Sequence, residues 1–76
     1  MNKAIETSLL EIDISSQKCH LKMMDGSKWF VNPYDLPTIA TWIPTETIEI
    51  KKNINAMFSY DITNIAEGVT VTAIKL

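Results

Sequence analysis

The sequence predicts an all-β fold, a small six-stranded barrel or a strongly curled antiparallel sheet with one short helical insert after the third strand. Two observations lead to this prediction. Six short segments alternate apolar and polar residues and recur at intervals of about ten residues, a spacing typical of small all-β domains. One stretch, residues 38–43, instead carries apolar residues at helical spacing between two prolines.

Turn residues separate the six expected strands. The first strand begins at Ser8 and alternates as far as Ile14, and residues 1–7 are expected to form a loose lead-in. Its hairpin with the second strand should place Leu10 opposite Met23 and Ile12 opposite Leu21. The expected strands span residues 8–14, 19–23, 27–31, 47–51, 58–63 and 69–74.

The turn between the second and third strands decides which side chains face the core. A two-residue Asp-Gly loop would place Trp29 opposite Lys22, on the face away from Leu21. A three-residue loop, residues 24–26, with Gly26 in the left-handed conformation places Trp29 opposite Leu21 instead. We expect the second arrangement, because a tryptophan buries far more apolar area opposite a leucine than opposite a lysine.

The helical insert has a predicted role in closing the barrel. Ile39, Trp42 and Ile43 have the spacing of one or two helical turns, which should lay Trp42 across one open end of the sheet. The strands leave an SH3-like and an OB-like topology open. The expected core consists of Leu10, Ile12, Ile14, Leu21, Met23, Trp29, Val31, Ile39, Trp42, Ile48, Ile50, Tyr60, Ile62, Val69 and Val71.

Length and charge limit the classes of function. Seventy-six residues make a single domain, residues 1–76, and the net charge of −2 comes from nine acids against seven lysines, with no arginine. Arginine is the usual residue for bidentate recognition of phosphate and guanine, so its absence argues against a nucleic-acid partner. Lys22 and Lys28 are expected to lie close together on the outer face of one hairpin.

The chain gives few signals about its compartment. Cys19 is the only cysteine, so an intramolecular disulfide cannot form. No apolar run reaches the roughly 18 residues of a membrane helix, so no membrane partner is expected. The chain as it stands is expected to be cytoplasmic, and a periplasmic location stays open if a signal peptide has been removed.

A set of motifs runs from about Cys19 to Ala73. They are Asp25-Gly26-Ser27-x-Trp29-x-Val31-x-Pro33-x-Asp35, Trp42-x-Pro44, Ile48-x-Ile50, Tyr60-x-Ile62-x-Asn64 and Gly68-x-x-Val71-x-Ala73. This pattern resembles a family of small bacterial proteins of unknown function. The resemblance implies a compact β-barrel and, for some similar sequences, export across the inner membrane. It implies no activity and no catalytic residue.

No constellation of side chains predicts catalysis, a metal or a cofactor. Cys19 and His20 are neighbours in a strand, so their side chains should point to opposite faces and cannot readily share a proton. One histidine and one cysteine also fall short of a zinc site. Asp25, Asp35 and Asp61 are each explained by a turn, a helix cap or an outward strand position. The sequence therefore predicts a protein that is not an enzyme.

The candidate binding surface is a band of apolar residues at outward-facing strand positions. Leu9 and Met24 should lie nearly opposite each other across the first hairpin. Phe30 should point outward on the third strand, opposite His20, and Tyr34 should follow it. A contiguous apolar patch indicates a binding or self-association surface. We therefore expect a protein-interaction or accessory module that binds another protein or a second copy of itself. The alternative is an oligonucleotide- or small-ligand-binding barrel, with aromatic rings as a stacking platform.

Overall fold

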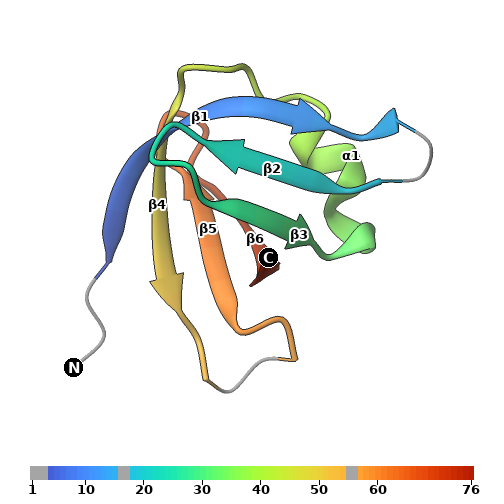
Figure 1. Cartoon of the computed structure of the whole chain (residues 1–76), viewed down its shortest axis with the longest axis vertical. Helices are drawn as coiled ribbons and strands as arrows, with labels where there is room; N and C mark the ends of the chain where they lie inside the picture. Colours follow the sequence, from blue (N-terminus) through green and yellow to red (C-terminus); the bar gives the residue numbers. More distant parts are fainter. Residues whose placement is uncertain (1–3, 16–17, 55–56) are drawn as a thin grey trace.

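Six antiparallel strands close into a barrel in the computed structural model, which describes residues 4–15, 18–54 and 57–76 (Figure 1). The predicted all-β barrel with one short helical insert after the third strand is confirmed. The strands are β1 (Ile5–Asp13), β2 (His20–Met23), β3 (Lys28–Val31), β4 (Thr47–Lys52), β5 (Tyr60–Asn64) and β6 (Val69–Lys75).

The barrel is built from two three-stranded meanders. Strands β1 to β3 form one and β4 to β6 form the other, and the barrel closes because β1 pairs with β4 and β3 pairs with β6. An OB-fold is a five-stranded, partly open barrel, so this barrel differs from it by one strand and by its full closure. Closure gives every strand a neighbour on each side, although parts of β1 and β6 pair on one side alone.

β1 is the longest strand and bends between two partners. Its first half, Ile5 to Ser8, pairs with β4, and its second half pairs with β2. The prediction that residues 1–7 form a loose lead-in was wrong for residues 5–7, because pairing with β4 fixes their backbone. Residues 1–3 lie outside the described part of the chain.

A β-bulge in the middle of β1 changes which of its side chains face inward. Leu9, not Leu10, lies opposite Met23, and the register shifts between Leu9 and Glu11. One inserted residue reverses the in-out alternation, so Leu9 is fully buried and Leu10 is exposed. The prediction that Leu10 is a core residue was therefore wrong. Ile14 was also predicted to belong to the core, but it lies beyond the end of β1 and is exposed. Downstream of the bulge, the predicted pairing of Ile12 with Leu21 is confirmed.

The turn between β2 and β3 has the predicted register. Leu21 lies opposite Trp29, and Gly26 has a φ of +92°, which is the left-handed conformation. Three hydrogen bonds hold the turn: Asp25 Oδ1 accepts from the Ser27 amide at 2.9 Å and from its hydroxyl at 2.6 Å, and the Ser27 hydroxyl accepts from Trp29 Nε1 at 2.9 Å. The Asp-Gly-Ser-x-Trp motif is thus one structural unit.

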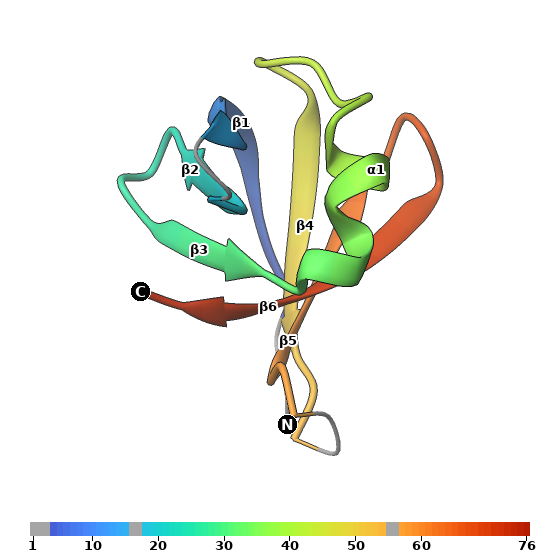
Figure 2. The ribbon, with the colours of Figure 1, turned by 90° about the vertical axis from the view of Figure 1, so that its right-hand side faces the viewer.

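The helical insert starts earlier than predicted. A 3₁₀ helix η2 (Pro33–Asp35) leads into a single turn of α-helix α1 (Leu36–Ile39), which lies at one end of the barrel (Figure 2). Trp42 follows the helix and is only 4 % exposed, which confirms that it is covered at that end. Ile43, predicted to share its face, is 63 % exposed because the chain has left the helix before it.

The core fills the barrel with inward-facing side chains from all six strands and the insert. Val69 was predicted to belong to it, but it begins β6 at the rim and is exposed. Ile12 and Tyr60 are half-buried and pack against the core. The buried apolar residues are Leu9, Cys19, Leu21, Met23, Trp29, Val31, Ile39, Trp42, Ile48, Ile50, Ile62, Val71 and Ala73.

A polar contact ties the link before β4 to β5. Asn64 is fully buried, and its side-chain amide donates to Glu46 Oε1 at 2.9 Å, which also accepts from the Ile43 amide at 2.7 Å. Burial of Asn64 strengthens its bond to Glu46 and makes the loss of that bond costly. The two bonds hold the chain between α1 and β4 against the barrel.

Thr45 has a backbone conformation that is unfavourable for a threonine. Its φ is +82°, and it follows Pro44 in a turn closed by the Glu46 amide donating to the Ile43 carbonyl at 3.2 Å. These are features of a type II turn, whose third position favours glycine. The Thr45 amide also donates to the Leu9 carbonyl at 2.7 Å, next to the bulge in β1, so this pairing holds the strained residue in place.

Replacing Thr45 by glycine should therefore stabilise the protein. Removing the left-handed penalty of about 1–2 kcal/mol outweighs the entropy cost of about 0.5–1 kcal/mol for a new glycine. We expect Thr45→Gly to raise the free energy of unfolding by roughly 0.5–1 kcal/mol in urea denaturation. Thr47→Gly, at an exposed position in β4, is the control and should destabilise. If Thr45→Gly lowers the free energy of unfolding as much as Thr47→Gly does, the backbone of Thr45 is not strained.

Candidate functional site

The candidate site is a hollow of about 240 Å³ on the outside of the barrel, over β2. The first meander supplies its walls, with β1 on one side, β3 on the other and Lys18, ahead of β2, at one end. Most of its lining side chains carry charge. The lining residues are Glu11, Asp13, Lys18, His20, Leu21, Lys22 and Lys28.

Three charged side chains form a row across the strands. Lys22 has Glu11 opposite on β1 and Lys28 opposite on β3. Directly opposite residues in an antiparallel pair have Cβ atoms about 4.5–5.5 Å apart, and two like charges in that position destabilise the sheet. The sequence prediction that Lys22 and Lys28 lie close together on the outer face is confirmed. Lys22 therefore has an acid, Glu11, on its β1 side and a second lysine, Lys28, on its β3 side.

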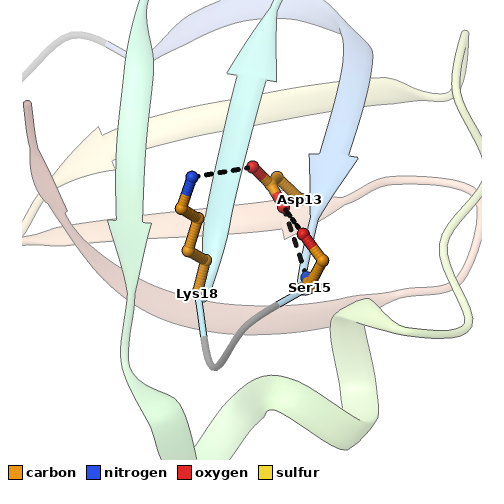
Figure 3. Close-up of polar contacts among 3 residues, drawn as sticks. All are labelled: Asp13, Ser15 and Lys18. Carbon is orange, nitrogen blue, oxygen red and sulfur yellow. Dashed lines mark hydrogen bonds and ion pairs between the residues drawn. The ribbon is translucent and has the colours of Figure 1, made fainter.

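The other acid of the hollow is already engaged (Figure 3). Asp13 Oδ1 accepts from the Ser15 hydroxyl at 2.8 Å and from its amide at 3.2 Å, and Oδ2 lies 3.8 Å from Lys18 Nζ. The hydroxyl hydrogen bond, more than the nearby lysine, lowers the pKa of Asp13 below its ordinary value of 3.8. Asp13 therefore stays ionised at neutral pH, and its carboxylate is bound by Ser15 and Lys18.

A second row runs parallel to the charged one and is mainly aromatic. His20 lies opposite Asp13 on one side and opposite Phe30 on the other, as predicted for Phe30. The His20 ring meets the Phe30 ring edge-on with centroids 5.9 Å apart, and Phe58 packs on Phe30 at 5.8 Å. Phe30 points outward but is half-buried, because rings from two other parts of the chain cover it.

The structure does not assemble the predicted apolar surface. Leu9 is a core residue, because the bulge turns it inward. Met24 is 51 % exposed and Tyr34 is 93 % exposed, but they lie beyond opposite ends of β3. Phe30, between them, is already partly covered. The four predicted residues therefore do not form one patch.

Sequence alternation puts Glu11, Asp13, Lys22 and Lys28 on the outer face. The predicted pairing of Ile12 with Leu21 also sets Asp13 opposite His20. These side chains were interpreted as a solvated surface, so the sequence placed them correctly but did not show that they surround a hollow.

Cys19 and His20 do not lie together as a catalytic pair. Cys19 faces the core, where burial raises the pKa of its thiol, and His20 packs on Phe30 outside, so the predicted divergence is confirmed. Among the residues that the structure describes, no three His, Cys, Asp or Glu side chains are grouped so that they could hold a metal ion.

The three aspartates considered for acid–base chemistry each have a structural partner. Asp25 holds the β2–β3 turn, Asp35 Oδ2 accepts from the Thr72 amide of β6 at 3.2 Å, and Asp61 accepts from the Asn53 side chain at 3.4 Å. These contacts explain why an aspartate stands at each position without invoking catalysis.

Comparisons of the chain with models of protein families, with curated proteins and with solved structures find no match. The resemblance to small bacterial barrel proteins therefore stays a prediction. Within the described ranges, no helix is both long enough and apolar enough to cross a membrane. The fold and the hollow thus define the molecule: a small closed barrel with a charged depression on its first meander.

Asp25 should make the stability of the protein depend on pH. Hydrogen bonds from Ser27, first from its hydroxyl, lower the pKa of Asp25 below 3.8 in the folded state. The stabilisation is therefore fully present above the unfolded pKa and is lost as the pH falls through the folded pKa. Between about pH 5 and about pH 2, the wild type should lose more stability than Asp25→Asn in urea denaturation.

Ser27→Ala is the control for this prediction, because it keeps the carboxylate but removes the hydroxyl that lowers its pKa. Its pH dependence should fall between those of the wild type and Asp25→Asn. Identical pH profiles for the wild type and Asp25→Asn would refute the role of Asp25.

Proposed function

We propose that the protein is a non-enzymatic binding module that takes a protein partner on the outer face of β1, β2 and β3. The observation that supports this proposal is the hollow over β2, with three lysines and two acids around it. Three ammonium groups against two carboxylates leave a formal charge of +1 there, whereas the whole chain carries −2. Such a local reversal of charge favours a partner of complementary charge.

Closure of the barrel favours recognition by side chains. A protein partner often binds by adding a strand to an open sheet edge, but in this closed barrel every strand has a neighbour on each side. Parts of β1 and β6 nevertheless pair on one side alone. The hollow on the outer face supplies directional charged groups for contact with a partner.

The size of the hollow argues for a macromolecular partner over a small one. Pockets for small molecules have volumes of about 300–1,000 Å³ and mostly apolar walls. This hollow has about 240 Å³ and a charged rim, while the interior of the barrel is filled by core side chains. A hollow of this kind fits one or two side chains of a partner.

An oligonucleotide is the second candidate, because the hollow lies on the strands that OB-fold barrels use for nucleic acid. Lys18, Lys22 and Lys28 would face its phosphates. Against it, Glu11 and Asp13 lie in the same hollow, and Phe30 is too covered to stack freely on a base. These contacts favour the protein partner.

A photo-crosslinking amino acid at Met24 tests the proposal, because Met24 is exposed and follows β2 directly beside the lysine pair. In extracts of the source cells we expect a discrete adduct that protease removes and nuclease does not. The adduct should be lost when Lys22→Glu and Lys28→Glu are added. The same amino acid at Lys51, exposed on β4, is the control and should not give that adduct.

Two results would overturn the proposal. An adduct that nuclease removes would favour the oligonucleotide. Equal adducts from positions 24 and 51, insensitive to the two charge reversals, would show that no partner is held at the hollow.

A further inference from the structure

We infer that the hollow binds a carboxylate of an acidic protein segment between Lys22 and Lys28, the two lysines that face each other across β2 and β3. This inference rests on the proposed function and specifies the chemistry of the partner. It depends on the pairing of the lysines, on the engagement of the nearby acids and on the mixed charge of the rim.

The lysine pair has an acid beside it only at Lys22, which lies opposite Glu11 on β1. Lys22 and Lys28 are cross-strand neighbours on the outer face. Within the described ranges, no carboxylate lies within ion-pair distance of either ammonium group. Two like charges in this arrangement repel, so the site costs the fold some stability until an anion enters it. A carboxylate between the two ammonium groups would remove that repulsion and gain two charge-assisted hydrogen bonds.

The acids nearby cannot take this role. Asp13 is engaged by Ser15 and Lys18, as described above. Glu11 lies opposite Lys22 on β1, on the side away from Lys28. The side of Lys22 that faces Lys28 therefore has no acid opposite it.

The rim favours a carboxylate of a peptide over the phosphates of a nucleic acid. A nucleic-acid strand brings a line of negative charges, and some of these would meet Glu11 and Asp13. A peptide can place one acid between the lysines and a basic or neutral residue next to Glu11.

An NMR titration tests the inference on the full chain at low ionic strength, where screening is weak. The probe is a blocked peptide, acetyl-Ala-Glu-Glu-Glu-Lys-amide, and the matched neutral probe has glutamine in place of each glutamate. The acidic peptide should shift the amide signals of His20, Lys22 and Lys28 saturably, and the glutamine peptide should not. Lys22→Gln or Lys28→Gln should each weaken binding about two- to fivefold, and Lys51→Gln should leave it unchanged.

The variants should fold, because each removes a repulsion from the surface, and their amide spectra and melting temperatures check this. Equal shifts with the glutamine peptide would overturn the inference. Tighter binding of inorganic phosphate than of the acidic peptide would also overturn it, in favour of a phosphate ligand. If no saturable shift occurs but the Met24 adduct still forms, the inference fails and the proposed function stands. If the adduct is absent as well, both fail.

Discussion

The register of the β2–β3 hairpin is the constraint on which the rest of the molecule depends. Asp25, Ser27 and Trp29 are linked by hydrogen bonds across a turn that needs the left-handed conformation of Gly26. This turn sends Trp29 into the core opposite Leu21 and, on the same strands, sends Lys22 and Lys28 outward as neighbours. A slip of one residue would exchange the two faces, exposing the tryptophan and burying the lysines. The core and the candidate site are therefore two consequences of one register.

The sequence predicted this register because one comparison decides it. Trp29 buries more apolar area opposite Leu21 than it would opposite Lys22. It also predicted the six strands, the helical insert and the burial of Trp42. It failed at β1, where alternation suggested that Leu10 is buried and the structure buries Leu9. A bulge is a response to the bend that lets β1 pair with both β2 and β4, and that bend arises only when the barrel closes.

The candidate site was less predictable than the fold. Local alternation placed Lys22, Lys28 and Phe30 on the outer face, and the pairing of Ile12 with Leu21 placed Glu11 and Asp13 beside Lys22 and His20. Nothing in the sequence showed that these side chains surround a hollow. Alternation also could not foresee that Phe58, far along the chain, covers Phe30. The strained Thr45 shows the same dependence, since its conformation is held by pairing with Leu9 at the bulge. Features that depend on contacts between the two meanders were the ones that sequence reasoning missed.

A double-mutant cycle between Lys22 and Lys28 tests most directly the claim that the register leaves an unneutralised lysine pair on the outer face. The free energies of unfolding of the wild type, Lys22→Gln, Lys28→Gln and the double variant give the coupling between the two side chains. At low salt we expect a repulsive coupling of about 0.2–1 kcal/mol that fades in about 1 M salt, and no coupling between Lys28 and Lys51. A zero or attractive coupling between Lys22 and Lys28 at low salt would contradict the account.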